Sequence, residues 1–154
     1  MKNIGYYNGK TGLIEDMTIP MSDRACYFGD GIYDATCCKN NTVYLIDEHL
    51  DRFFGNCAKV EIVPPISKQA LRGLLIELAS QVYADDRFVY WQCSRGVAAR
   101  SHAFPENTPA SLMVTVSPAA MPNLNEKIRL ITLEDTRFLH CDIKTINLLP
   151  SVIA

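Results

Sequence analysis

The C-terminal segment of this 154-residue chain restricts its possible folds more than any other feature. In CDIKTINLL, residues 141–149, Lys144 follows an acidic residue and stands at the start of an apolar run. The tail LLPSVIA has no helix cap, no terminal glycine and no charged residue. A helix or strand this apolar needs other protein surface to cover it. We therefore expect the chain to be a piece of a longer protein that is cut shortly after Lys144.

The composition excludes several classes of protein. Hydrophobic residues make up 48% of the chain and charged residues 21%, as in ordinary soluble domains. A net charge of −2 offers no electrostatic surface for nucleic acid or an anionic membrane. The N-terminus lacks an apolar signal core, and no apolar run is long enough to span a membrane. Neither a nucleic acid nor a membrane partner is expected, and the predicted location is the cytoplasm.

The six cysteines have no CxxC spacing and no small-secreted-domain context. Cys37 and Cys38 would point to opposite faces of one strand and cannot share a metal ion. We expect no metal site, no disulfides, and reduced thiols that are mostly buried.

Alternating and continuous apolar runs, punctuated by turn residues, predict a series of strands. The expected strands cover residues 4–7, 13–14 (after an Asn8-Gly9 hairpin turn), 32–38, 42–45, 88–93 and 112–116. Residues 23–31, with two glycines around Asp30, are predicted to form a loop.

Two helices are predicted between the strands. Asp47 is a plausible N-cap for a helix that ends near Val60, with apolar residues on one face. Ser67 is predicted to cap the second helix. The proline-rich stretch at 118–123 is the clearest linker, and another strand is expected over 127–132. The predicted division is a first domain over 1–117, a linker over 118–126 and the start of a second domain over 127–154.

Lys144 is the first candidate for chemistry. A lysine amine becomes a nucleophile that forms Schiff bases when apolar or cationic surroundings lower its pKa. The neighbouring Ile143 and Ile146 favour partial burial. From spacing alone, a surface lysine at the start of a helix is an equally good interpretation.

Three further residues, Arg100, His102 and Tyr33, have polar side chains that could bind a ligand. Arg100 and His102 are alternate residues of an extended loop, so both side chains face the same way and together suit a carboxylate. A solvated loop pair is the plainer interpretation. Tyr33 follows a Gly-Asp-Gly loop and either projects its hydroxyl into a cleft or is a half-buried core aromatic.

Arg52 lies on the first predicted helix. Its guanidinium could clamp a phosphate. Spacing alone favours the alternative, in which Arg52 pairs with Asp51 or Glu48 on the helix surface.

Four sequence motifs, each weak alone, are more specific when they are considered together and in their order along the chain. They are FGDGIYD at 28–34, DEHLDR at 47–52, SRGVAARSHAFPEN at 94–107 and RFLHCDIKTINLL at 137–149. This series resembles the class IV, or fold-type IV, pyridoxal-phosphate aminotransferases, and within them the D-amino-acid (D-alanine) aminotransferases. The resemblance covers essentially the whole chain. It implies an α+β fold, in which an antiparallel sheet flanked by two helices is followed by the opening of a truncated second domain.

The resemblance also implies a role for each candidate. Lys144 matches the lysine that holds pyridoxal phosphate and moves the substrate proton, and Arg52 matches an arginine that binds the cofactor phosphate. Tyr33, Arg100 and His102 match the trap for the substrate carboxylate, with the last two supplied by the other subunit of a homodimer. The Arg-x-His pair is the part that indicates D-amino acids.

The implied reaction is transamination between a D-amino acid and a 2-oxo acid. A branched-chain L-amino-acid aminotransferase and an aminodeoxychorismate lyase remain alternatives within the family. A non-catalytic interaction domain is the alternative from another class. The family's second half, with the acidic residue that pairs with the pyridine nitrogen, has no counterpart here, so this chain alone is expected to be a poor enzyme.

Overall fold

The computed structural model describes residues 1–121, 123–137 and 139–153. Its centre is a six-stranded antiparallel sheet in the order β2-β1-β6-β5-β3-β4. The strands are β1 (Ile4–Tyr7), β2 (Lys10–Gly12), β3 (Gly31–Lys39), β4 (Thr42–Val43), β5 (Asp86–Ser94) and β6 (Ser111–Pro118). The helices are α1 (Arg24–Phe28), α2 (Ile46–Lys59), α3 (Lys68–Ser80) and α4 (Leu149–Ile153), with a 3-10 turn η1 (Ile14–Asp16). The predicted α+β class is confirmed.

The first hairpin is set by its turn. Tyr7 pairs with Lys10, and both intervening residues have positive φ, 44° at Asn8 and 89° at Gly9. This two-residue geometry matches the twist of the strands and starts the return strand at once. The predicted return strand over 13–14 is therefore wrong: β2 occupies residues 10–12, and η1 follows it.

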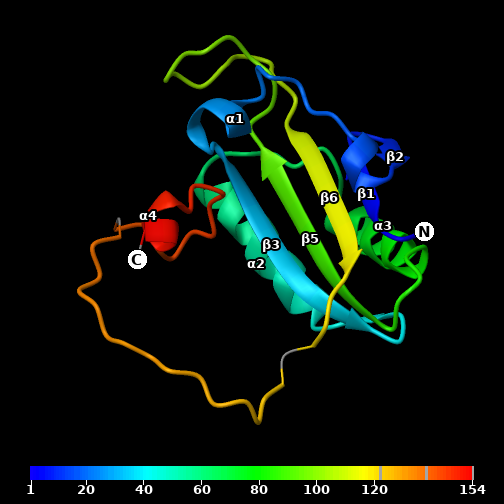
Figure 1. Cartoon of the computed structure of the whole chain (residues 1–154). Coiled ribbons are helices and arrows are strands. Elements are labelled where there is room, and N and C mark those ends of the chain that lie inside the picture. Colours follow the sequence, from blue (N-terminus) through cyan, green and yellow to red (C-terminus); the bar gives the residue numbers. More distant parts are fainter. Residues whose placement is uncertain (122, 138, 154) are drawn as a thin grey trace.

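Figure 1 shows the two long helices, α2 and α3, behind the sheet on one of its faces. The prediction that Ser67 caps α3 is confirmed, since its side chain accepts a hydrogen bond from the amide of Ala70. The prediction that Asp47 caps α2 is wrong. The helix begins at Ile46, two residues earlier than a cap at Asp47 requires, after Leu45 in the left-handed region, and Asp47 accepts a hydrogen bond from Arg72 of α3 instead.

The core lies between the sheet and these helices. Alternate residues of β5 point into it, and Trp91 meets the ring of Phe53 from α2 at 6.1 Å and 63°. Three of the cysteines are buried, Cys38, Cys57 and Cys93. Cys26 and Cys141 are exposed, so the expectation of mostly buried thiols holds for only part of the set.

The predicted loop over 23–31 contains a short helix, α1. Asp23 caps it by accepting a hydrogen bond from the amide of Ala25, and Gly29 ends it at φ 61°. The loop prediction was wrong because the segment has little helical periodicity and the cap at its start is the only strong signal.

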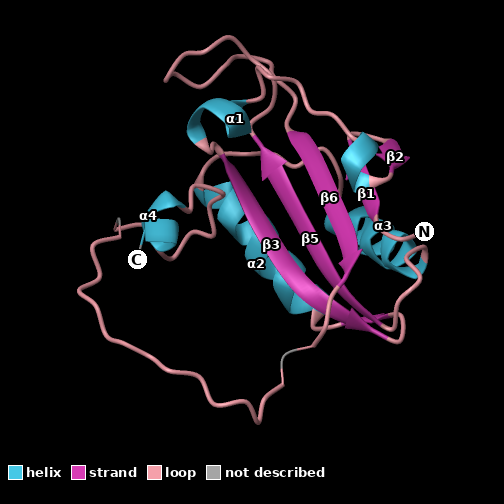
Figure 2. Cartoon of the chain, in the orientation of Figure 1, coloured by secondary structure: helices cyan, strands magenta, loops and turns pink. Residues whose placement is uncertain are grey.

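After β6 the chain leaves the sheet in a long excursion, orange in Figure 1, and then returns to the edge of β3. The strand predicted over 127–132 is not formed. Ile128, Leu130 and Ile131 are each more than 70% exposed, because this stretch lies away from the sheet and has no neighbouring strand to pair with (Figure 2). The division into domains near residue 118 stays a prediction. None of the helices in the described part of the chain has the length and apolarity that crossing a membrane requires.

Candidate active site

Lys144 reaches the sheet through its backbone. The amide of Tyr33 donates to the carbonyl of Lys144 at 3.0 Å, and the amide of Ile146 donates to the carbonyl of Gly31 at 3.0 Å. These bonds use the first residues of β3 on the side that β5 does not occupy, where Ile32 and Thr145 face each other. The lysine segment, residues 144–146, is thus added to the sheet as a short edge pairing.

The lysine amine lies over an aromatic ring. Lys144 Nζ is 4.0 Å from the centroid of the Tyr33 ring, within the range of a cation–π contact. Tyr33 in turn stacks on Tyr90 at 5.5 Å, and burial followed by the neighbouring Tyr33 raises the pKa of Tyr90 to about 12. Tyr33 is half-buried, so it both packs against the sheet and faces an open space.

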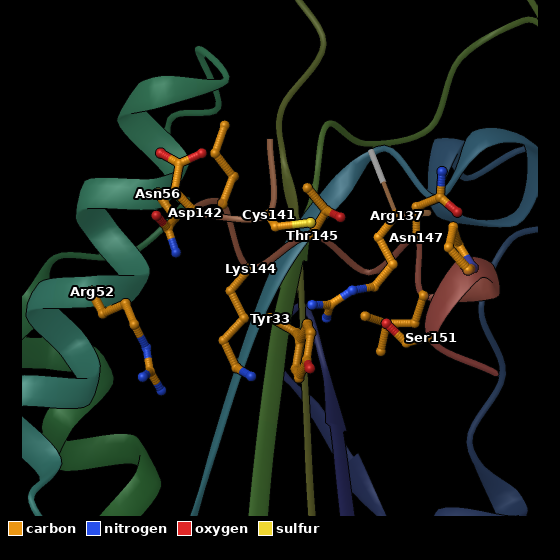
Figure 3. Close-up of a pocket in the computed structure, with 13 residues that line it drawn as sticks. Tyr33, Arg52, Asn56, Arg137, Cys141, Asp142, Lys144, Thr145, Asn147 and Ser151 are labelled. Atoms are coloured by element: carbon orange, nitrogen blue, oxygen red, sulfur yellow. The ribbon is translucent and has the colours of Figure 1, made fainter. Parts of the chain in front are cut away.

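That space is a cavity of about 350 Å³ between α2, β3 and the segment around Lys144. In Figure 3, Lys144 and Tyr33 lie at its centre, Arg52 approaches from α2, and Arg137 approaches from the opposite side. The volume falls within the range of small-molecule sites. Three of the five predicted site residues, Lys144, Arg52 and Tyr33, line this one cavity.

Arg52 makes neither of the surface pairs that its spacing suggests. Its guanidinium donates to both carboxylate oxygens of Asp34, at 2.8 Å from Nε and 2.7 Å from Nη2. His49 Nδ1 lies 2.9 Å from the same carboxylate. Burial alone would raise the pKa of Asp34, but the hydrogen bonds from Arg52 and His49 outweigh it and hold that pKa below its ordinary value. Arg52 is therefore oriented by a buried partner, while half of its side chain remains exposed.

Neither Asp34 nor His49 was among the site residues predicted from the sequence. A signal for Asp34 was present, because it falls on the inward face of a strand, in step with Ile32. A carboxylate at a core position requires a charged or hydrogen-bonding partner.

Two further cavity residues were also missed. Asn56 on α2 is 4% exposed, and its amide nitrogen Nδ2 has no hydrogen-bond partner among the described residues. Arg137 pairs with Asp135 at 2.9 Å and also lines the cavity. No single-sequence signal marks Asn56, since only the position of the lysine segment turns that face of α2 into a cavity wall.

Arg100 and His102 lie elsewhere in the described structure. Both are exposed, and neither lines the cavity around Lys144. They converge on Phe28 at the end of α1: Arg100 Cζ is 5.3 Å from the ring centroid, and the His102 ring is 5.4 Å away. The two side chains thus face the same neighbour, although the loop bends at Arg100 and His102 instead of running extended as predicted.

The sequence model of the amino-transferase class IV family matches residues 31–154. The chain belongs to the class IV aminotransferase family. The matched region starts at β3 and includes the lysine segment, the helix that carries Arg52 and the loop that carries Arg100.

Individual relatives agree with this membership. The chain is 36% identical over 145 residues to a D-alanine aminotransferase of Listeria monocytogenes, a match that covers 91% of this chain and 50% of the relative. The chain therefore spans about half the length of the curated relatives it matches.

Solved structures show the same fold. A 4-amino-4-deoxychorismate lyase from Pseudomonas aeruginosa superposes with a TM-score of 0.80 at 24% identity, over 97% of this chain and 55% of the lyase. A branched-chain amino acid aminotransferase complexed with N-(5'-phosphopyridoxyl)-L-glutamate gives a TM-score of 0.68 at 16% identity, over 75% of this chain and 40% of the enzyme.

Proposed function

We propose that this chain is the N-terminal part of a pyridoxal-phosphate-dependent aminotransferase that exchanges an amino group between a D-amino acid, of the D-alanine type, and a 2-oxo acid. The observation that carries the proposal is the position of the Lys144 amine on the Tyr33 ring, in the same cavity as Arg52. The D-alanine aminotransferase relative supports the substrate class, and the phosphopyridoxyl complex of the fold relative supports the cofactor.

The residues that line the cavity fit this cofactor. Lys144 offers an amine, the half-exposed Arg52 offers a fixed guanidinium for a phosphate, and Asn56 offers an unpaired amide donor in a buried wall. An orphaned donor in a cavity wall is expected where a ligand oxygen completes the hydrogen bonding. Bound pyridoxal phosphate supplies an electron sink for the substrate carbon.

The chain's own residues then have distinct tasks. The Lys144 amine would hold the cofactor as its nucleophile, and the free amine would act as the base that moves the proton to and from the substrate Cα. Arg52, oriented by its two hydrogen bonds to Asp34, would hold the cofactor phosphate. Tyr33 limits the positions that the lysine amine can take, because its ring lies directly beneath it.

The carboxylate trap of Arg100 and His102 is proposed to act on the partner subunit of a homodimer. Its distance from the cavity within one chain is the reason for this part of the proposal, since neither residue lines the wall around Lys144. Their exposure on a loop leaves them accessible to a second copy. We also propose that a second domain begins at residue 127 and that the protein is cytoplasmic.

Labelling tests the role of Lys144. Borohydride reduction of the chain with pyridoxal phosphate, followed by peptide mass spectrometry, should place the pyridoxyl group on Lys144 rather than on the other six lysines. Lys144→Ala should abolish that label, and Lys127→Ala, a change in the exposed excursion, should leave it unchanged. A label scattered over surface lysines would contradict the proposed site in this chain.

Substrate profiling of the complete gene product tests the reaction. We expect transamination with D-alanine and a 2-oxo acid, and little turnover of L-leucine or aminodeoxychorismate. Arg100→Ala and His102→Ala should each raise the KM for D-alanine. Preference for L-leucine or for aminodeoxychorismate would replace the D-amino-acid proposal with the corresponding alternative, and failure to bind pyridoxal phosphate would favour a non-catalytic interaction domain.

A further inference from the structure

We propose that Arg24 of α1 is the positioning residue for the carboxylate loop, which we define as residues 100–103. The inference rests on the proposed function, because it concerns the loop that carries the proposed carboxylate trap. Arg24 would hold this loop, through hydrogen bonds to its backbone, in a shape that can bind a carboxylate.

Arg24 binds the backbone of the loop directly. Its Nη1 donates to the carbonyl of Ser101 at 2.6 Å and lies 3.3 Å from the carbonyl of Ala103. These two carbonyls flank His102 in the chain, so Arg24 restrains the backbone on both sides of that residue. Arg24 is only 3% exposed, which places its charge inside the protein rather than at the loop surface.

A shared carboxylate fixes the guanidinium in turn. Arg24 Nε donates to Asp30 Oδ2 at 2.7 Å, and Arg95 Nε donates to the same oxygen at 2.9 Å. Arg95 also stacks on Phe104, with Cζ 3.6 Å from the ring centroid. Asp30 thus orients two buried arginines, one under the carboxylate loop and one under the residue that follows it.

Phe28 links Arg24 to the side chains of the loop. It lies four residues after Arg24, on the same side of α1. Arg24 Cζ is 4.9 Å from its ring centroid, and Arg100 and His102 also contact that ring. Backbone hydrogen bonds from Arg24 and side-chain packing on Phe28 therefore act on the same four residues.

Arg24 is therefore expected to affect binding of the substrate carboxylate and not the reaction at the Lys144 amine. A guanidinium binds a carboxylate well only when its planar donors are already oriented. Arg24 is buried and its donors are directed at Asp30 and the loop carbonyls, so it does not touch the substrate itself. Its loss should weaken carboxylate binding while the Lys144 amine, on another element, keeps its surroundings.

The test uses the complete gene product with Arg24→Gln, Arg24→Lys and the control Arg72→Gln. Arg72 is a partly exposed arginine of α3 that pairs with Asp47 of α2. We expect Arg24→Gln to raise the KM for D-alanine about tenfold or more, which corresponds to one lost hydrogen bond to a charged group. The kcat and the pyridoxyl label on Lys144 should stay within twofold. Arg24→Lys should restore part of the binding, because its ammonium can still donate to one of the two loop carbonyls, those of Ser101 and Ala103. The control Arg72→Gln should have the same KM and kcat as the parent protein.

A second readout distinguishes the failure of this inference from the failure of the proposed function. Tryptic cleavage after Arg100, in the exposed loop, should speed up in Arg24→Gln, and in Phe28→Leu if the first variant does not fold. An active parent whose variants keep both the KM and the slow cleavage would overturn the inference alone. An inactive parent that retains the Lys144 label would overturn the proposed reaction. In that case unchanged cleavage after Arg100 would overturn the positioning role of Arg24 as well, and faster cleavage would support it.

Discussion

Asp34 shows at the scale of one residue how a buried charge serves the site. It is fully buried on β3, and its carboxylate holds Arg52 in a two-bond fork at the edge of the cavity. His49 occupies one of the same oxygens, so the carboxylate is satisfied before any ligand arrives. The guanidinium that faces the cavity is consequently pre-oriented, which lowers the entropy cost of binding an anion.

The lowered pKa of Asp34 predicts the pH dependence of folding. A carboxyl whose pKa is lower in the folded state stabilises the protein above its unfolded pKa of about 4, and that stabilisation is lost as the pH falls through the folded pKa. Asp34→Asn should lower the free energy of unfolding by about 2 kcal/mol at pH 7, a modest value because Arg52 is half exposed. The difference from the parent should shrink below about pH 4.

Urea unfolding at pH 7, 5, 4 and 3, followed through the single buried tryptophan Trp91, measures this difference. The exposed Asp85→Asn serves as the matched control and should show little change at any of these pH values. A difference between Asp34→Asn and the parent that grows on acidification would contradict the assigned sign.

At the scale of elements, β3 organises the site through alternation. Its inward-facing residues include Ile32 and Asp34, while Tyr33 between them points to the opposite face of the sheet. Its first residues also accept the lysine segment at the free edge. One strand therefore supplies the ring under the lysine, the partner of the arginine and the backbone that holds the lysine.

Gly31 tests this edge pairing. A Cβ there would lie 2.7 Å from the carbonyl oxygen of Cys93 and 3.0 Å from Cδ1 of Ile146, so either β5 or the lysine segment must move. Gly31→Ala should destabilise the chain and reduce the borohydride label on Lys144. Gly55→Ala is the matched control: its Cβ meets nothing within 4 Å, and it should stabilise α2 by about 0.5–1 kcal/mol. Equal labelling in both variants would argue against the edge pairing.

The N-cap of α3 provides a second test at this scale. Ser67→Ala removes the acceptor for the Ala70 amide and should cost about 1 kcal/mol of stability in urea unfolding. Ser80→Ala, in the last turn of the same helix, should cost less, because its hydroxyl bonds an exposed carbonyl rather than an orphan amide. A larger loss in Ser80→Ala would show that the cap contributes little.

At the scale of the whole molecule, the structure consists of a packed sheet-and-helix layer and an exposed excursion between β6 and the lysine segment. The described residues of this excursion, 119–121 and 123–137, include several exposed apolar side chains, and Figure 1 shows the ribbon looping away from the sheet before it returns to β3. Lys59 of α2 bonds Asp142 at 2.7 Å, which ties the returning segment to the layer.

Limited trypsin digestion should therefore cut at Lys127 and Arg129 before it cuts at any site within residues 1–118. Arg87 is buried within β5 and should be resistant under the same conditions. Mass spectrometry of the early fragments makes the comparison. Early cleavage within β5, at a rate equal to that in the excursion, would contradict the predicted domain boundary near 118.

Local patterns in the sequence determined most of the elements of this protein. The strand around Trp91, the cap at Ser67 and the Asn8-Gly9 turn depend on neighbours within a few residues, so they can be read without the fold. Motif order likewise pointed to the class IV family, which the family match bears out. The catalytic roles of Lys144, Arg52, Tyr33, Arg100 and His102 remain predictions.

Only the tertiary structure decided which side chains meet. Arg52 pairs with Asp34 rather than with a helix neighbour, because packing α2 on β3 brings a buried carboxylate within reach. Arg24 supports the carboxylate loop across 77 residues of sequence, a contact that no local pattern encodes. Long-range pairs of this kind follow from how sheet and helices pack, and that packing depends on the whole chain at once.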